Sequence, residues 1–154
     1  CLLQRGAQMV CAVDVGYGQL DYRLRSHPRV LSMERVNARF PFPIPQPADI
    51  ATVDVSFISL TKVLPQVATH LKSGAPLVVL VKPQFEAQRN EVSRGGVVKD
   101  PQLHAAVLAR VVVWAINGGF RLLDLTPSPI LGDAGNREFF LLLQHHASFS
   151  RNPG

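Results

Sequence analysis

Runs of apolar residues along the chain predict several short, buried strands. The clearest run is 77–81, five consecutive apolar residues that stand between Gly74 and Pro83. A continuous run of this length is typical of a strand covered on both faces, as in a parallel sheet. Pro83 has no backbone N–H, so regular pairing is expected to stop at Lys82. Similar runs predict further strands at 9–13, 30–34, 50–53, 121–125 and 139–143.

Helices are predicted between these strands by apolar residues at spacings of three and four. The segment 60–71 follows this spacing, with Pro65 inside it. The segment 101–117 is predicted to be a second helix, because Asp100 supplies a cap, Pro101 suits the first turn and Gly118 ends the pattern. A shorter helix is predicted at 19–25.

The order of these segments predicts an α/β fold with a doubly wound, mostly parallel sheet. The last two strands are joined by a connection too short for a parallel crossover, so the final strand is expected to be antiparallel. Prolines alternate through 40–47, which predicts an extended surface connection, and 84–99 has the composition of a loop. The first residues look like the end of a helix closed by Gly6, so preceding sequence is expected to be missing.

The composition is that of a globular domain and not of a disordered or membrane-spanning protein. The chain has 154 residues, of which 47% are hydrophobic and 18% charged, values typical of one globular domain. No apolar run is long enough to span a bilayer, so no membrane partner is expected, while a net charge of +5 is compatible with a polyanionic partner. The two cysteines fit no zinc or redox spacing and are expected to be reduced thiols, which predicts a cytoplasmic protein. No set of Cys, His and carboxylates has the spacing of metal ligands, so no metal is expected.

Charged residues gather at the predicted ends of strands. Three strands are followed by Asp14, Asp54 and Lys82, and the last strand is preceded by Glu138. In a parallel sheet with an antiparallel final strand these four positions meet at one edge, where ligands bind in open α/β sheets. Two carboxylates near a lysine can hold and orient its ammonium group. A network of ion pairs that merely closes the sheet edge is the alternative interpretation.

The first of these acids, Asp14, is followed by the glycine pair Gly16 and Gly18. A dinucleotide-binding fingerprint is excluded, because its third glycine would fall on Asp21 and its acidic residue would follow the glycines instead of preceding them. An aspartate at the end of a strand suits a different task, which is to accept hydrogen bonds from the two ribose hydroxyls of a nucleoside ligand.

Five motifs, in order and spread over nearly the whole chain, resemble the TlyA family. They are DVGYGQLD at 14–21, DVSFISL at 54–60, VKPQFE at 81–86, GGVVKDP at 95–101, and the stretch from SPI at 128–130 to GNREF at 135–139. Members of this family are FtsJ-like, S-adenosylmethionine-dependent methyltransferases of ribosomal RNA, often called haemolysins.

The resemblance implies a Rossmann-like methyltransferase sheet, mostly parallel with an antiparallel last strand. The first strand of that sheet would be missing from this chain, which would leave a gap or force the strands before Asp14 and Asp54 to pair. A partial FtsJ-like domain would cover 1–147, and 148–154 would be a flexible tail.

The resemblance also implies an activity, a cofactor and roles for particular residues. The family methylates ribose 2′-hydroxyls of cytidines in ribosomal RNA with a Lys-Asp-Lys-Glu tetrad, and Asp54, Lys82 and Glu138 match its last three members. Lys82 would be the base, or the cation that assists ionisation of the hydroxyl, and the two carboxylates would hold it in place. Asp14, Asn37 and Asp54 are implied to bind the cofactor, S-adenosylmethionine.

The partner implied by the resemblance is ribosomal RNA within ribosomal subunits. Candidate cations for its phosphates are Arg89, Arg94, Lys99 and Arg137. The first lysine of the tetrad and the glycine-rich cofactor loop would lie upstream of residue 1, so the chain by itself is expected to be inactive. Two alternatives stay open, a membrane-active haemolysin and an RNA-binding remnant without catalysis.

Overall fold

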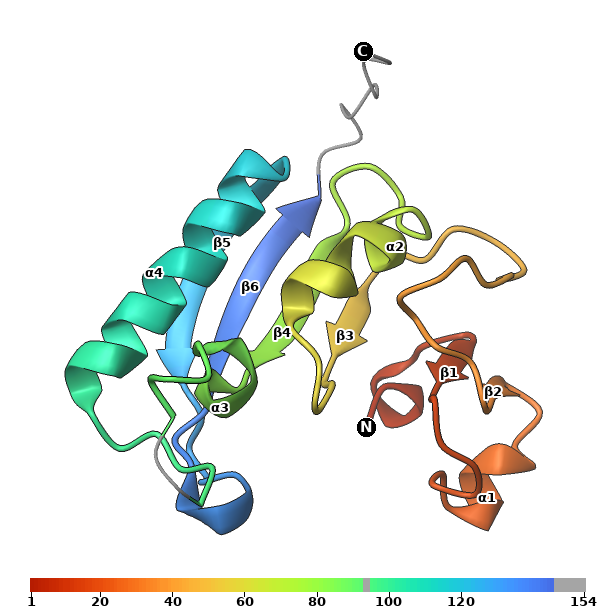
Figure 1. The fold of residues 1–154 in the computed structure, drawn as a ribbon. Helices are drawn as coiled ribbons and strands as arrows, with labels where there is room; N and C mark the ends of the chain where they lie inside the picture. The colour runs from red at the N-terminus through yellow and green to blue at the C-terminus, as the bar shows by residue number, and fades with distance from the viewer. Residues whose placement is uncertain (93–94, 146–154) are drawn as a thin grey trace. The chain divides into compact units, whose positions relative to one another are not determined.

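The structure is a computed structural model that describes residues 1–92 and 95–145 (Figure 1). The chain divides into two compact units, Cys1–Pro45 and Gln46–Gly154, and each is described by itself. Strands and helices follow one another along both units, which confirms the predicted α/β class.

The first unit is built on two parallel strands, β1 (Val10–Val13) and β2 (Val30–Met33). It opens with the 3-10 turn η1 (Leu3–Arg5), which is followed by Gly6 at a φ of +92°. Glycine adopts this left-handed conformation without a steric penalty, and it is common after the last turn of a helix. The predicted helix end at Gly6 is therefore confirmed.

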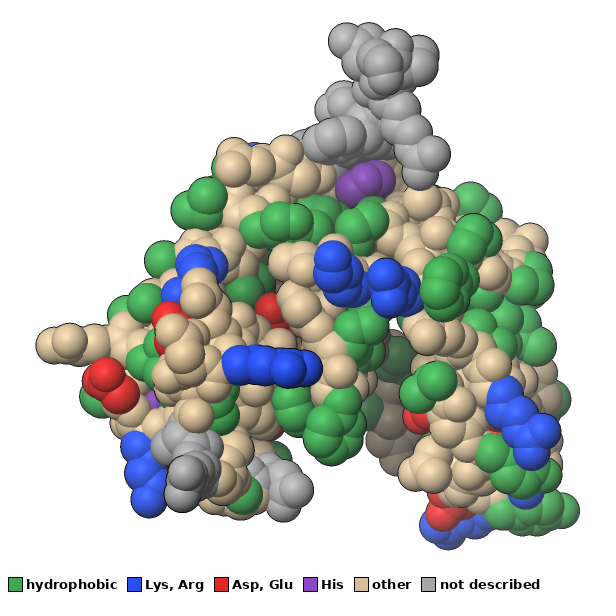
Figure 2. Space-filling view, in the orientation of Figure 1, with side chains coloured by type: hydrophobic (Ala, Val, Ile, Leu, Met, Phe, Trp, Pro, Cys, Tyr) green, Lys and Arg blue, Asp and Glu red, His purple; other side chains and the backbone are tan. Residues whose placement is uncertain are grey.

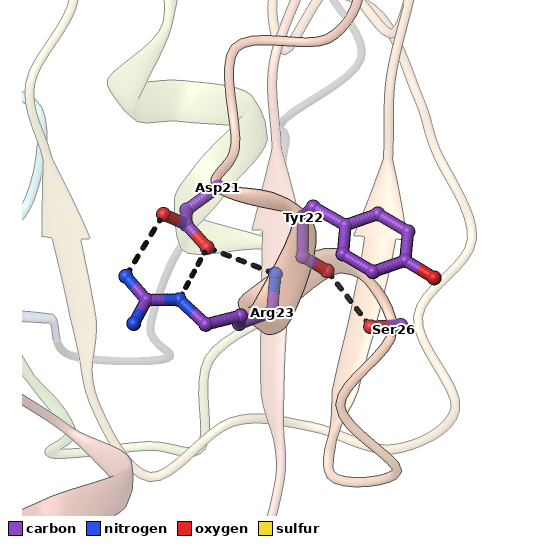
Figure 3. A network of polar contacts seen from close by, with 4 residues as sticks. All are labelled: Asp21, Tyr22, Arg23 and Ser26. Atoms are coloured by element: carbon purple, nitrogen blue, oxygen red, sulfur yellow. Dashed lines mark hydrogen bonds and ion pairs between the residues drawn. The ribbon is translucent and has the colours of Figure 1, made fainter.

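The short helix α1 (Tyr22–Arg25) begins at Tyr22 rather than at residue 19, because Asp21 is its cap. Oδ1 of Asp21 accepts a hydrogen bond from the backbone N–H of Arg23 at 2.8 Å (Figure 3). The guanidinium of Arg23 contacts the same carboxylate at 3.2 and 3.3 Å, and these bonds lower the pKa of Asp21. Ser26 Oγ donates to the carbonyl oxygen of Tyr22 at 2.8 Å in the last turn.

The second unit contains a four-stranded sheet with the order β3-β4-β6-β5. β3 (Ala51–Val53) and β4 (Pro76–Val81) are parallel, whereas β6 (Phe139–His145) runs antiparallel to both β4 and β5 (Phe120–Pro127). The predicted antiparallel final strand is confirmed. Its direction brings the start of β6 to the edge where β3 and β4 end, since Phe139 and Val81 are register partners.

Helices cover one face of this sheet (Figure 1). α4 (Pro101–Asn117) has the predicted bounds, and Asp100 caps it by accepting a hydrogen bond from the N–H of Gln102 at 2.9 Å. Alternate residues of β4 and β6 point toward the helices and are buried. The core between the helices and the sheet contains Leu60, Leu64, Leu77, Val79, Val81, Val107, Leu141 and Leu143.

Two predictions about helices in this unit are wrong. The single helix expected over 60–71 is divided into the 3-10 turn η2 (Leu60–Lys62) and the helix α2 (Leu64–Ala68). Pro65 lies in the first turn of α2, where its missing N–H is tolerated, and it therefore marks a start instead of an interior. The short helix α3 (Pro83–Glu86) lies in the segment predicted to be a loop.

Parallel strands pair within each unit. β1 pairs with β2 in the first unit, and β3 pairs with β4 in the second. Within the described ranges, no helix combines the length and the apolar character that a membrane crossing requires.

Candidate active site

Lys82 lies where β4 ends, and its ammonium group is held by two residues of the loop after β3. Nζ is 2.8 Å from Oδ1 of Asp54 and donates a hydrogen bond to Oγ of Ser56 at 2.9 Å. The side chain of Lys82 is 15% exposed and that of Asp54 is 66% exposed, so the lysine is the more enclosed partner. Pro83, in the first turn of α3, ends the strand at this lysine. The structure therefore brings Asp54 and Lys82 together.

Glu138 directly precedes β6 and lies at the same edge of the sheet. It is only 8% exposed, and its Oε1 accepts a hydrogen bond from Nε2 of Gln84 at 3.4 Å. In the part of the chain that is described, the ion pair of Lys82 is with Asp54 and not with Glu138. The expectation that both carboxylates hold the ammonium group is met by Asp54 alone.

The carboxylate of Glu138 packs against Gly132 instead. A Cβ atom built at position 132 would collide with Oε1 of Glu138 and would lie 2.9 Å from Oε2. Gly132 does not have a positive φ, so the close approach of the carboxylate, and not the backbone conformation, requires a glycine here.

A cleft of about 520 Å³ is lined by Asp54, Lys82 and Glu138 together. Its volume lies within the range of small-molecule sites, about 300–1,000 Å³. Most of the remaining lining is apolar, as is typical of ligand pockets in which a few polar groups fix orientation. These apolar residues are Val53, Val78, Leu80, Pro129, Ile130, Leu131 and Phe140.

Asp14 follows β1 in the first unit, and only one of its carboxylate oxygens accepts a hydrogen bond from the described residues. Oδ1 accepts a hydrogen bond from the N–H of Gly16 at 2.6 Å. Oδ2 has no hydrogen-bond partner among the described residues. An aspartate with one oxygen fixed by its own loop and the other available fits an acceptor for ribose hydroxyls.

Asn37, the second residue implied to bind the cofactor, follows β2. Its Oδ1 accepts a hydrogen bond from the N–H of Arg39 at 3.0 Å, so the amide oxygen is committed to a local turn. The loops after β1 and β2 are tied together by Glu34, whose Oε1 accepts a hydrogen bond from the N–H of Gly18 at 2.8 Å. The sequence analysis had assigned no role to Glu34.

Three of the four cations proposed to bind RNA are exposed and make no ion pair in the described ranges: Arg89, Lys99 and Arg137. The fourth, Arg94, lies outside the described residues. On the face shown in Figure 2, Lys and Arg side chains stand singly or in small groups among other side chains. The described residues contain no group of three potential ligands that could hold a metal ion.

Glu86, at the end of α3, is a half-buried acid that the sequence analysis did not select. Its Oε2 accepts a hydrogen bond from Ser59 Oγ and its Oε1 accepts one from the N–H of Leu60, both at 2.7 Å. Burial raises the pKa of Glu86, and these two bonds oppose the rise. Glu86 and its two partners belong to motifs quoted from the sequence, but the local spacing does not indicate that Glu86 contacts Ser59 and Leu60.

Asn136 is a buried polar residue that the sequence analysis also missed. Its Oδ1 accepts a hydrogen bond from the N–H of Val98 at 3.0 Å, and its Nδ2 donates to the carbonyl oxygen of Gly96 at 3.2 Å. The residue is 3% exposed and lies two positions before Glu138. It therefore joins the loop before β6 to the loop before α4.

An α/β domain that presents Asp54, Lys82 and Glu138 at one edge of its sheet, beside one cleft, has the organisation of a ligand site in a Rossmann-like fold. The profile of the FtsJ-like methyltransferases matches residues 1–145. The chain therefore belongs to the FtsJ-like methyltransferase family.

Relatives with known names share this family. The chain is 46% identical over 145 residues to the 16S/23S rRNA (cytidine-2′-O)-methyltransferase TlyA of Mycobacterium tuberculosis, covering 93% of this chain and 54% of that protein. A solved protein from Streptococcus thermophilus, named as a hemolysin, superposes with a TM-score of 0.91 at 43% identity, covering 96% of this chain and 54% of that one. The chain spans about half the length of the curated relatives it matches.

A more distant structure shows a shared fold alone. It is an S-adenosylmethionine-dependent methyltransferase of Listeria monocytogenes with a TM-score of 0.66 at 13% identity, covering 94% of this chain and 83% of that one. Together these matches confirm the predicted TlyA resemblance, the Rossmann-like methyltransferase fold and S-adenosylmethionine as the cofactor of the family.

Proposed function

We propose that the protein containing this chain transfers a methyl group from S-adenosylmethionine to ribose 2′-hydroxyls of ribosomal RNA, with cytidine as the target nucleoside. The observation that carries this proposal is the ammonium group of Lys82, held by Asp54 and Ser56 beside a cleft that Glu138 also lines. The family match and the printed activity of the TlyA relative support the same reaction.

The side chains of the cleft have separate tasks in this proposal. When bound, the cofactor supplies an electrophilic methyl group on a sulfonium. The side chain of Lys82 orients the 2′-hydroxyl and assists the loss of its proton, and Asp54 fixes the direction of the Lys82 side chain. The buried carboxylate of Glu138 would add negative charge near the methyl donor. Because the transfer is a direct displacement, positioning supplies much of the rate.

Cofactor and RNA would be bound by residues outside this group of three. Asp14 would accept hydrogen bonds from ribose hydroxyls of the cofactor through Oδ2, with Asn37 contacting its adenine through the amide nitrogen. Arg89, Arg94, Lys99 and Arg137 would bind RNA phosphates, which makes ribosomal subunits the proposed partner. Binding through these cations would weaken as the salt concentration rises.

The test compares the complete protein that contains these residues with its Lys82→Ala variant, on ribosomal RNA from cells that lack the protein. Methylation by the variant should fall by about 10²–10⁴-fold, the usual contribution of a positioned acid or base. RNA binding should persist, and Lys72→Ala, which removes an exposed lysine paired with Asp49, should methylate normally. If Lys82→Ala methylates the RNA as well as the wild type, Lys82 is not the catalytic residue. If the wild type itself binds the RNA without methylating it, the protein is an RNA-binding remnant.

A second candidate function, membrane lysis, takes its support from the hemolysin name of the Streptococcus thermophilus protein. It predicts that the purified complete protein releases dye from liposomes, and that Lys82→Ala does so equally well. Absence of dye release at concentrations that support RNA methylation would remove this candidate.

A further inference from the structure

Two segments of the second unit meet residue by residue beside Lys82. One is the loop 54–60 after β3, and the other is α3 with the lysine that precedes it. Lys82 contacts Asp54 and Ser56, the rings of Phe85 and Phe57 are tilted with centroids 4.8 Å apart, and Glu86 binds the end of the loop. The position of Asp54 and Ser56 relative to Lys82 therefore depends on how the whole loop is held.

The loop has little internal support of its own. Residues 55–58 make no backbone–backbone hydrogen bond within the described ranges. Phe57 has a φ of +62°, a backbone conformation that non-glycine residues adopt only when the surrounding structure imposes it. Its side chain is 90% exposed. The ion pair at the start of the loop includes a largely exposed Asp54, and exposed pairs contribute little by themselves.

The far end of the loop is held firmly by Glu86. One carboxylate oxygen accepts the Leu60 N–H and the other accepts the Ser59 hydroxyl, and both bonds are short at 2.7 Å. Ser59 also caps η2, because its Oγ accepts a hydrogen bond from the N–H of Thr61 at 3.2 Å. Leu60 is 1% exposed in the core. Glu86 thus fastens α3 to the residues five and six positions after Asp54.

We propose that Glu86 is a positioning residue for methyl transfer, which sets the placement of Asp54 and Ser56 around the Lys82 ammonium by anchoring the loop 54–60 to α3. The inference rests on the proposed function, since it assigns Glu86 a role in the same reaction. Glu86 itself does not touch the substrate and acts through the loop.

The test measures kcat and both KM values for Glu86→Ala and Glu86→Gln in the complete protein. Glu86→Ala should lower kcat by about 10–100-fold, because a displacement on the order of 1 Å at reacting groups has effects of this size. Its KM values should change by less than about threefold, since neither substrate is bound by this residue. Glu86→Gln should stay within about threefold of the wild-type kcat, because the amide oxygen can accept from Leu60 and the amide nitrogen can donate to Ser59.

Two further variants keep the test decisive. Ser59→Ala removes one of the two bonds and should lower kcat by a smaller factor than Glu86→Ala, so it replaces that variant if the latter does not fold. Asp49→Ala removes an exposed carboxylate of the same unit and should leave kcat unchanged. A wild-type kcat in Glu86→Ala, or in Ser59→Ala if only that variant folds, overturns the inference.

Lys82→Ala, assayed in the same series, separates this inference from the proposed function. If Lys82→Ala is inactive while Glu86→Ala keeps a wild-type kcat, the inference fails and the function stands. If Lys82→Ala is fully active, the proposed function fails, and the inference fails with it.

Discussion

The loops after β1 and β3 both begin with an aspartate, but they are held in different ways. In the first unit, Oδ1 of Asp14 accepts a hydrogen bond from the N–H of Gly16 in the same loop. The backbone of this loop is bound to the one after β2, because the carbonyl oxygen of Asp14 accepts from the N–H of Val36 and that of Gly16 from the N–H of Arg35. In the second unit, Asp54 pairs with a lysine from the next strand, and side chains hold the loop. An acid at the end of a strand can therefore present a free oxygen to a ligand or orient another side chain.

The comparison predicts an effect on kcat for the aspartate of the second unit and an effect on the cofactor KM for that of the first. The larger of the two is expected at Asp54. Asp54→Asn removes the charge that fixes the Lys82 ammonium, so kcat should fall by about 10²-fold with modest changes in KM. Asp14→Asn keeps an acceptor for the Gly16 N–H but weakens the bonds to ribose hydroxyls, so the KM for the cofactor should rise by about tenfold. Steady-state kinetics of both variants in the complete protein measure this difference.

The opposite pattern would contradict the comparison. A cofactor-KM effect at Asp54 without a change in kcat would make Asp54 a binding residue only. An unchanged cofactor KM in Asp14→Asn would remove the first unit from the proposed cofactor site.

A smaller effect is expected from Gly132→Ala. The added methyl group would occupy the space of the Glu138 carboxylate and displace it, so kcat/KM should fall by about tenfold. The control is Gly132→Ala in the Glu138→Ala background, where no carboxylate is left for the added methyl group to displace. An equal loss from Gly132→Ala in both backgrounds would show that the glycine acts on something other than Glu138.

The smallest effect concerns stability and lies away from both loops. Hydrogen bonds from Arg110, at 2.7 and 3.0 Å, lower the pKa of Glu91. A carboxyl group whose pKa is lowered by folding stabilises the protein above its unfolded pKa and loses this contribution as the pH falls through the folded value. Glu91→Gln should therefore melt at a lower temperature than the wild type at pH 7, and the difference should shrink as the pH falls below the ordinary pKa of a glutamate, about 4.3. A difference that stays constant with pH would mean that ionisation of Glu91 plays no part.

Glu86 should show the opposite sign in the same thermal series. Burial raises its pKa, so the ionised form is the less favourable one in the folded state. The melting temperature of Glu86→Gln relative to the wild type should increase as the pH rises above the ordinary range of a glutamate.

The sequence was sufficient for elements that rest on local patterns. The apolar run before Lys82, the cap and proline before α4, and the short connection before β6 each specify backbone structure within a few residues. The closeness of Asp54 and Lys82 followed from the parallel order of their strands, because residues that follow neighbouring parallel strands share one edge.

Other features depend on contacts between loops, for which sequence spacing contains no information. Glu138 was expected to pair with Lys82, but the conformation of the loop before β6 places its carboxylate against Gly132. The sequence placed Glu86 in a polar loop, and its hydrogen bonds to Ser59 and Leu60 form only where α3 meets the loop after β3. The end of strand pairing at Pro83 was predicted correctly, but the helix that begins there was not, although proline is also favoured in the first turn of a helix.

The most direct test of the central claim is a single-turnover measurement of methyl transfer by Lys82→Ala, with and without added methylamine. If the Lys82 side chain assists the 2′-hydroxyl, the variant should lose about 10²–10⁴-fold in rate, and a small amine that enters the vacated space should restore part of it. RNA and cofactor affinities should be those of the wild type. A variant that transfers the methyl group at the wild-type rate, indifferent to the amine, would contradict the assignment of Lys82 as the catalytic residue.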